Sequence, residues 1–225
     1  MLRAIVFDFD GVIANSEPLH YRAFREVLAV SGAELSEQDY YGHYLGYDDV
    51  GVFKAVAVDR GLVWNLERVT ELVSLKAARL EALERDLSML FPGAEAAIRR
   101  AADTVPVAIA SGALGSEIRR VLDRARLTDC FAAIVAAEDT PVGKPAPEPY
   151  LRAVALLSDA LSSPLNAADV VAIEDSPWGL QSARGAGLRT VAVAHTYDAG
   201  ALDADLVIPS LDELDVKALE RLCSD

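Results

Sequence analysis

Cysteine and basic side chains are scarce in this 225-residue chain, and it has no long apolar run. Cys130 and Cys223 are the only cysteines and neither belongs to a CxxC pair, so a disulfide framework is excluded and a reducing compartment is favoured. The 21 Lys and Arg side chains face 35 Asp and Glu, which gives a formal net charge of −14. Nucleic acids and anionic membranes attract basic surfaces, so neither is an expected partner.

No apolar segment has the length of a membrane span, and the first residues lack the basic, apolar and small-residue regions of a secretory signal. We therefore expect a soluble, cytoplasmic protein. The acidic, evenly charged sequence shows no obvious apolar surface patch, and this favours a monomer.

Short, continuous apolar runs alternate with helical patterns over most of the chain. Examples are PVAIAS at 106–111 and DVVAIED at 169–175, each followed by a turn signal and a helical pattern. Continuous runs are typical of parallel strands that are covered on both faces. The sequence therefore predicts an α/β fold with a doubly wound, mostly parallel, Rossmann-like sheet. Its expected strands are 4–10, 106–111, 132–138, 169–175, 189–194 and 206–209.

Residues 15–88 have a different pattern, with Arg, Glu, Leu and Ala at helical spacing and no convincing parallel strand. Pro92 and Gly93 then mark the return to alternating strands and helices. The simplest interpretation is an α/β core domain made of 1–14 and 89–225, with a helical domain at 15–88 inserted after the first strand.

Polar side chains follow several of the expected strands. In open α/β sheets, ligands bind beyond the carboxyl ends of the strands, so these side chains are candidates for one common site. The candidates at this edge are Asp8, Asp10, Ser111, Gly112, Lys144, Glu174 and Asp175.

Four carboxylates in one partly dry cleft would repel one another strongly. A divalent cation relieves this repulsion, and oxygen ligands with room for water suit Mg²⁺. Lys144 and the Ser111 hydroxyl would neutralise and orient phosphate oxygens, and a carboxylate can serve as the nucleophile of phosphoryl transfer. Structural interpretations stay open: Asp8 and Asp10 could form a turn, and Lys144 could be a solvated loop charge.

Four motifs carry a resemblance to a known family. DFDGV, the strand-end Ser111, the Lys144-Pro145-x-Pro pattern and IEDSPWGLQSARGAG resemble, in order and spacing, the motifs of the haloacid dehalogenase (HAD) superfamily. The resemblance covers the whole chain, and the nearest group is that of β-phosphoglucomutase and the small sugar-phosphate phosphatases. It implies a HAD core with an inserted helical cap. Haloacid dehalogenases proper lack the second aspartate, so the chain resembles a phosphotransferase.

The resemblance also implies roles for the core residues. Asp8 would be the nucleophile, and Asp10 the general acid and then the base. Mg²⁺ would bind Asp8, the Asp10 backbone carbonyl and Asp175, with Glu174 as a ligand or close beside them. The phosphoryl group would be held by Ser111, Gly112 and Lys144.

Within the helical insert, Lys76 lies where β-phosphoglucomutase-like caps carry a lysine that faces the substrate. His20 matches a family position near the cap entrance. Both are candidates for substrate binding, although helical lysines are usually solvated and a histidine at a hinge can simply be hydrogen-bonded.

Two departures from the mutase pattern concern its grip on the second, non-reacting phosphate. After Leu45-Gly46 the mutases have an arginine, whereas this chain continues YDD at 47–49. After Ser111 they have polar residues, whereas this chain continues GALG. The loss of both grips favours a Mg²⁺-dependent phosphatase that hydrolyses small phosphorylated metabolites, with sugar phosphates as the expected class, through an aspartyl phosphate. A β-phosphoglucomutase-like mutase is the alternative. A non-catalytic receiver domain is disfavoured because such domains lack the helical insert and an acid equivalent to Asp10.

Overall fold

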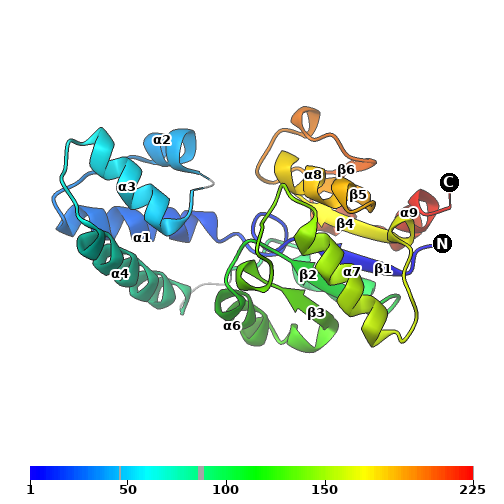
Figure 1. Ribbon diagram of the computed structural model, residues 1–225. Helices are drawn as coiled ribbons and strands as arrows, with labels where there is room; N and C mark the ends of the chain where they lie inside the picture. The colour runs from blue at the N-terminus through cyan, green and yellow to red at the C-terminus, as the bar shows by residue number, and fades with distance from the viewer. Residues whose placement is uncertain (46, 86–88, 225) are drawn as a thin grey trace. The chain divides into compact units, whose positions relative to one another are not determined.

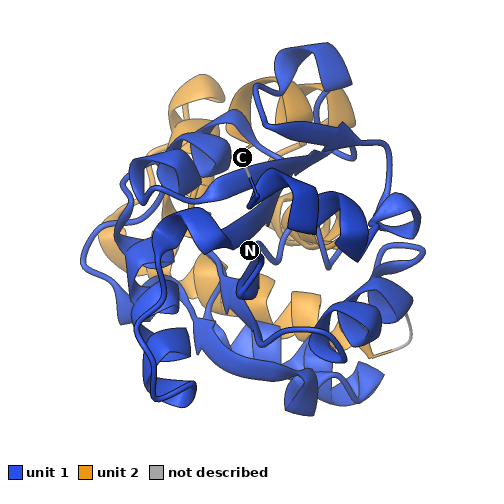
Figure 2. Cartoon of the chain, turned by 90° about the vertical axis from the view of Figure 1, so that its right-hand side faces the viewer, with its two compact units in different colours: residues 1–15, 90–225 blue, residues 16–89 orange. Residues whose placement is uncertain are grey.

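The computed structural model describes residues 1–45, 47–85 and 89–224. It contains two compact units: unit 1 comprises Met1–Asn15 and Leu90–Asp225, and unit 2 comprises Ser16–Met89 (Figure 2). The boundaries drawn from the sequence fall after residues 14 and 88, and residue 88 lies outside the described residues.

Unit 1 is built on a six-stranded parallel sheet with the strand order β3-β2-β1-β4-β5-β6 (Figure 1). This order confirms the predicted doubly wound, Rossmann-like α/β core, in which the direction of strand progression reverses between β1 and β4. The strands are β1 (Ala4–Phe7), β2 (Val107–Ala110), β3 (Phe131–Val135), β4 (Val170–Glu174), β5 (Arg189–Val193) and β6 (Leu206–Ile208).

The α-helices of unit 1 precede, separate or follow its strands. They are α5 (Ala94–Ala102), α6 (Gly115–Ala125), α7 (Glu148–Ala160), α8 (Pro177–Gly185) and α9 (Val216–Leu222). Short 3₁₀ turns lie at Thr128–Cys130, Ala137–Asp139, Ala167–Asp169, Ala199–Ala201 and Leu211–Glu213.

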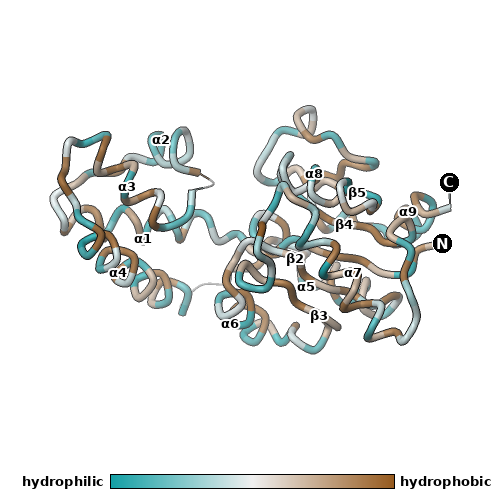
Figure 3. The backbone as a smooth tube through the Cα atoms, viewed as in Figure 1, coloured by the Kyte–Doolittle hydropathy of each residue, from teal (hydrophilic) through white to brown (hydrophobic). Residues whose placement is uncertain are grey.

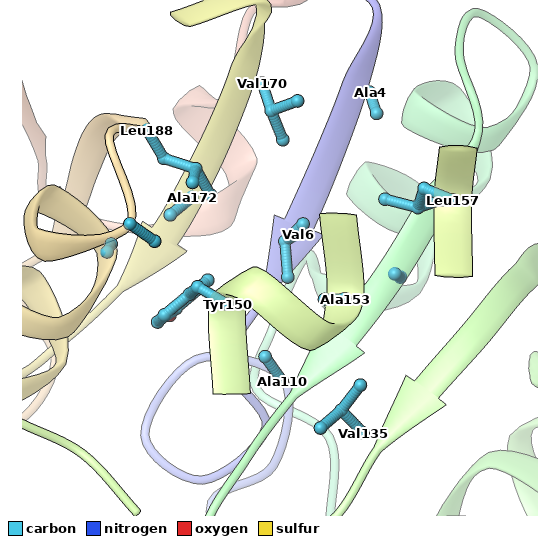
Figure 4. Close-up of a cluster of buried hydrophobic side chains, with 13 residues drawn as sticks. Ala4, Val6, Ala110, Val135, Tyr150, Ala153, Leu157, Val170, Ala172 and Leu188 are labelled. Carbon is cyan, nitrogen blue, oxygen red and sulfur yellow. The ribbon is translucent and has the colours of Figure 1, made fainter. Parts of the chain in front are cut away.

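Both faces of the sheet are buried, which explains the continuous apolar runs in the sequence. On one face, Val6 packs in a cluster with Tyr150, Ala153 and Leu157 of α7 (Figure 4). On the other face, Ile5 is also fully buried. Much of the backbone of the sheet is accordingly coloured as hydrophobic in Figure 3.

The first strand is shorter than expected from the sequence, because it ends at Phe7 and not at Asp10. The Asp8 amide still donates to the Ile173 carbonyl of β4 at 2.8 Å, so pairing continues one residue further. Gly11 then has a φ of +78°, a conformation that glycine adopts at little cost, and the chain turns away from the sheet. Asp8 and Asp10 therefore lie on a loop beyond the carboxyl end of β1.

Unit 2 is helical. Its helices are α1 (Glu17–Val30), α2 (Glu37–Asp39), a π-helical turn at Tyr40–Tyr44, α3 (Asp49–Asp59) and α4 (Leu66–Glu84). Their apolar faces form a core that includes Phe24, Phe53 and Leu72. The Asn65 side chain caps α4 by accepting from the Arg68 amide at 2.9 Å. Within the described residues, no helix combines the length and the apolar character needed to cross a bilayer.

Helix α7 provides a test of how the core stabilises unit 1. Leu157 is fully buried, whereas Leu151 on the same helix is 49% exposed. Leu157→Ala removes buried apolar surface and leaves a cavity, so we expect its free energy of unfolding to fall by about 2–5 kcal/mol. The matched control Leu151→Ala should change it by less than about 0.5 kcal/mol. Urea unfolding followed by circular dichroism measures both, and equal losses would contradict the packing described here.

Candidate active site

The candidate site lies at the carboxyl ends of β1 and β4, the neighbouring strands at which the sheet reverses its progression. Asp8 follows β1, Glu174 is the last residue of β4, and Asp175 comes directly after it. The register aligns Phe7 with Ile173, so both strands end at the same level. In doubly wound sheets this is the usual position of a ligand site.

Lys144 joins two of the carboxylates. Its Nζ donates to Asp8 Oδ1 at 2.7 Å and to Glu174 Oε1 at 2.6 Å, and it lies 5.0 Å from the centre of the Tyr150 ring. The lysine side chain is only 11% exposed. Burial lowers the pKa of Lys144, but the charges of Asp8 and Glu174 outweigh this and raise it overall, so the amine stays protonated.

Glu174 is fully buried, and protein groups donate to both of its oxygens. The Tyr150 hydroxyl donates to Oε1 at 2.9 Å, beside Lys144. The Asp175 amide at 3.0 Å and the Ser176 hydroxyl at 3.2 Å donate to Oε2. A Cβ on Gly179 would come within 1.9 Å of Oε1, so only glycine fits at that position of α8. Glu174 is thus held in one orientation from several sides.

Asp175 is also buried, at 5% exposure, and the loop after β1 packs directly against it. A Cβ on Gly11 would come within 1.9 Å of Asp175 Oδ2. Burial and the charge of Glu174 raise the pKa of Asp175 to about 7, against a hydrogen bond from Thr196 and the charge of Lys144. Burial also raises the pKa of Asp8, and Lys144 only partly offsets this.

Asp8, Glu174 and Asp175 each offer a carboxylate oxygen, and these oxygens lie within 4.8 Å of one another. Lys144 supplies one positive charge against these three carboxylates. Burial, and to a smaller extent the charge of Glu174, raise the pKa values of Asp8 and Asp175 by more than Lys144 offsets. The chemistry of this donor set therefore fits a hard divalent cation.

Two other predicted residues lie on the loop that follows β2. Ser111 is buried, its amide donates to the Val135 carbonyl, and its Oγ accepts from the Ala113 amide at 3.0 Å. Gly112 has open space where a side chain would be.

Asp10 is partly exposed and its backbone forms a bridge with Ala14. The structure thus brings Asp8, Lys144, Glu174 and Asp175 into mutual contact or close proximity, with Ser111 and Asp10 on loops at the same edge.

Lys76 and His20 both lie in unit 2, where they contact each other. Lys76 is 1% exposed, and its Nζ donates to Asp49 Oδ1 at 2.7 Å and lies 3.0 Å from His20 Nδ1. Because a protonated lysine can only donate, Nδ1 of His20 accepts and carries no proton. Burial and the charge of Lys76 lower the pKa of His20 to about 3. The ammonium predicted to face a substrate is thus already paired with Asp49 in this structure.

Several contributing residues were not singled out as site residues from the sequence. Tyr150 shows a usable signal, because it belongs to the apolar face of the helical pattern EPYLRAVALL and a buried tyrosine hydroxyl needs a partner. Gly179, His195 and Thr196 have no such signal. Their importance comes from contacts with segments far away in the sequence.

Comparison with known proteins is consistent with this geometry. A model of the haloacid dehalogenase-like hydrolase family matches residues 2–187. The chain is 31% identical over 223 residues to hexitol phosphatase B of Escherichia coli (strain K12), covering 96% of each protein. It is 31% identical over 233 residues to protein CbbY of Rhodobacter capsulatus, covering 98% of this chain and 99% of that protein.

A solved structure of β-phosphoglucomutase from Clostridium difficile superposes with a TM-score of 0.80 at 20% identity, covering 100% of this chain and 98% of that chain. At this identity the likeness concerns the fold alone. The family match and the relatives show that the chain belongs to the haloacid dehalogenase-like hydrolase family, as its motifs predicted, and that it is a phosphoric monoester hydrolase.

The low pKa of His20 predicts a pH dependence of stability. The folded protein protonates this ring only near pH 3, whereas an unfolded chain does so near 6.5. As the pH falls from about 7.5 to about 5, the unfolded state alone binds this proton, so His20 should lower the free energy of unfolding by about 1–2 kcal/mol.

Urea unfolding of His20→Asn at both pH values isolates this contribution, because the variant should lose less stability on acidification than the wild type. His43→Asn is the matched control, since His43 is exposed in the same unit, and it should keep the wild-type difference. The same acid sensitivity in His20→Asn as in the wild type would contradict the buried, neutral state of His20.

Proposed function

We propose that this protein is a Mg²⁺-dependent phosphatase of small phosphorylated metabolites, with sugar phosphates as the substrate class, acting through an aspartyl phosphate on Asp8. The observation that carries the proposal is the contact of buried Lys144 with Asp8 and Glu174, next to Asp175. A carboxylate held beside a fixed cation, with further carboxylates able to hold a metal ion, suits the transfer of a phosphoryl group.

The metal would be held by Asp8, Asp175 and the backbone carbonyl of Asp10, with Glu174 as a further ligand or directly beside them. Glu174 already accepts from several protein donors, which supports a role in orienting Lys144 and Asp175. When bound, Mg²⁺ would offset the negative charge of the phosphoryl oxygens as the transition state forms.

Two displacements at phosphorus account for hydrolysis. In the first, an Asp8 carboxylate oxygen attacks phosphorus, the bond to the ester oxygen breaks, and Asp10 donates its proton to that leaving oxygen. In the second, Asp10 takes a proton from water as the water oxygen attacks phosphorus, and the bond to Asp8 breaks to release phosphate. The Ser111 hydroxyl, the Gly112 backbone and the Lys144 ammonium would hold the phosphoryl oxygens throughout.

The contacts of Asp49 favour hydrolysis over the mutase alternative. A mutase of the β-phosphoglucomutase type must also bind the second phosphate of a bisphosphate intermediate, and the family pattern uses an arginine in the stretch that here reads YDD. In this stretch Asp49 accepts from Lys76, so its carboxylate already neutralises the Lys76 ammonium. A carboxylate thus lies where the family pattern supplies a cation for that phosphate. Gly46, just before this stretch, lies outside the described residues.

The proposed substrate class draws support from one relative, hexitol phosphatase B, whose name refers to a phosphorylated sugar alcohol. We further propose that unit 2 acts as the cap that selects the substrate. The monomeric state and cytoplasmic location expected from the sequence remain predictions.

The nucleophile is tested by Asp8→Asn with a panel of hexose, pentose and hexitol phosphates, phosphoglycolate and nucleotides in the presence of Mg²⁺. We expect the wild type to release phosphate only with the metal, and the variant to lose at least about 10³-fold in kcat because an amide cannot form the acyl phosphate. Asp159→Asn is the matched control, on the exposed side of α7. Phosphate release by Asp8→Asn at the wild-type rate would overturn the assignment. Isomerisation of β-glucose 1-phosphate driven by traces of bisphosphate would favour the mutase.

The role of Asp10 as the general acid is tested by comparing two substrates whose leaving groups differ in their need for a proton. Asp10→Asn should reduce kcat/KM for a sugar phosphate by about 10²–10⁴-fold, since its alkoxide must be protonated as it leaves. The loss in phosphorylation rate should be much smaller for p-nitrophenyl phosphate, whose phenolate leaves without a proton. Rapid-quench measurement of the first turnover compares the two substrates, and an equal loss for both would contradict this role.

A further inference from the structure

The turn after β5 contacts the candidate site through a residue that the mechanism does not use. His195 Nδ1 lies 3.0 Å from the Gly11 carbonyl oxygen. Its ring stacks on Phe91, with ring centres 4.0 Å apart and planes inclined by 18°. The next residue, Thr196, makes a side-chain hydrogen bond with Asp175. All of these residues belong to unit 1.

The contact with Gly11 defines which atom of His195 carries a proton. A carbonyl oxygen can only accept, so Nδ1 of His195 must be the donor. The Gly11 amide in turn donates to the Ala14 carbonyl at 2.9 Å. Gly11 is therefore held through both its N–H and its C=O, in the left-handed conformation that turns the chain directly after Asp10.

Phe91 connects the same histidine to the segment on which the chain returns to unit 1. The Phe91 amide donates to the Ile13 carbonyl at 3.0 Å, and Leu90 forms a β-bridge with Ala14. The His195 ring thus contacts the loop after β1 through a hydrogen bond and the returning segment through stacking. These two segments are where the chain leaves unit 1 and where it re-enters it.

The loop has little freedom to shift without changing the site. A Cβ on Gly11 would lie 1.9 Å from Asp175 Oδ2, so the backbone of the loop is in direct contact with that carboxylate. Loss of the hydrogen bond from His195 would release the Gly11 carbonyl and allow the backbone of the neighbouring Asp10 to shift. Misplacement of a reacting group by about 1 Å can cost about 10²-fold in rate.

We propose that His195 is a positioning residue that, by donating to the Gly11 carbonyl and stacking on Phe91, holds Asp10 in the orientation needed for proton transfer to the leaving group. This inference rests on the proposed function for the role of Asp10. It assigns His195 no contact with the substrate, so its loss should slow the first displacement for substrates whose leaving group needs an acid and leave substrate binding nearly unchanged.

Two variants separate the hydrogen bond from the packing of the ring. His195→Phe keeps an aromatic ring on Phe91 but removes the donor, whereas His195→Asn has an amide nitrogen that can occupy the place of Nδ1. We expect His195→Phe to slow the first turnover of the best sugar phosphate by about 10-fold or more, and the first turnover of p-nitrophenyl phosphate by less than about threefold. His195→Asn should recover most of the loss.

A residue needed only for stability would not produce this selectivity, because it would lower the activity towards both substrates by the same factor. An equal loss for the two substrates, a wild-type rate in His195→Phe, or no recovery in His195→Asn would overturn the proposal. If His195→Phe fails to fold, Phe91→Leu removes the stacking partner instead and should give a smaller loss with the same dependence on the leaving group.

Hydrogen exchange tests the positioning independently of activity. In His195→Phe, the amides of Gly11, Ile13 and Ala14 should exchange faster than in the wild type, while those of β3 at the far edge of the sheet should not change. Unchanged exchange at 9–14 would overturn the proposal even if no substrate were found. Absence of phosphate release by the wild type, with faster exchange in the variant, would refute the proposed function and leave the structural role of His195 standing.

Discussion

The site of unit 1 depends on one electrostatic constraint: three buried carboxylates share a single lysine. Lys144 contacts Asp8 and Glu174, while Asp175 is buried beside them. Burial raises the pKa values of Asp8 and Asp175, and the charge of the neighbouring Glu174 raises them further. A bound cation or an added proton would lower the free energy of this arrangement, which fits the divalent cation proposed for the site.

Strand pairing and core packing in unit 1 hold Asp8, Glu174 and Asp175 close together. The paired ends of β1 and β4 place Asp8 and Glu174 at one level. Helix α7 packs on the sheet through Leu157 (Figure 4). The Tyr150 hydroxyl of the same helix donates to Glu174. The favourable free energy of burying the hydrophobic core thus offsets the repulsion between the carboxylates. Each polar contact then holds a carboxylate in one orientation.

Unit 2 also has a buried charged cluster, in which a lysine and not a carboxylate is the central group. There Lys76 is almost completely buried, and Asp49 and His20 accept from it, with Phe24 beneath its ammonium at 4.7 Å from the ring centre. Because Lys76 already donates to these two partners, its ammonium is less available to bind an anion. The two buried clusters therefore differ in charge: the carboxylates of unit 1 outnumber their lysine, whereas Lys76 of unit 2 is matched by one carboxylate and a neutral histidine.

The sequence by itself determined the doubly wound sheet, the helical insert and the family, because parallel strands buried on both faces leave continuous apolar runs and strand ends carry the motif residues. It also named Asp8, Lys144, Glu174 and Asp175 as candidates. Only the tertiary structure decided that Lys144 pairs with Glu174 as well as Asp8, that Asp49 pairs with Lys76, and that His195 meets Gly11 and Phe91. Those contacts join residues that are far apart in the chain. Which residues meet depends on the directions of their side chains in the folded protein, and a local sequence pattern does not predict these directions.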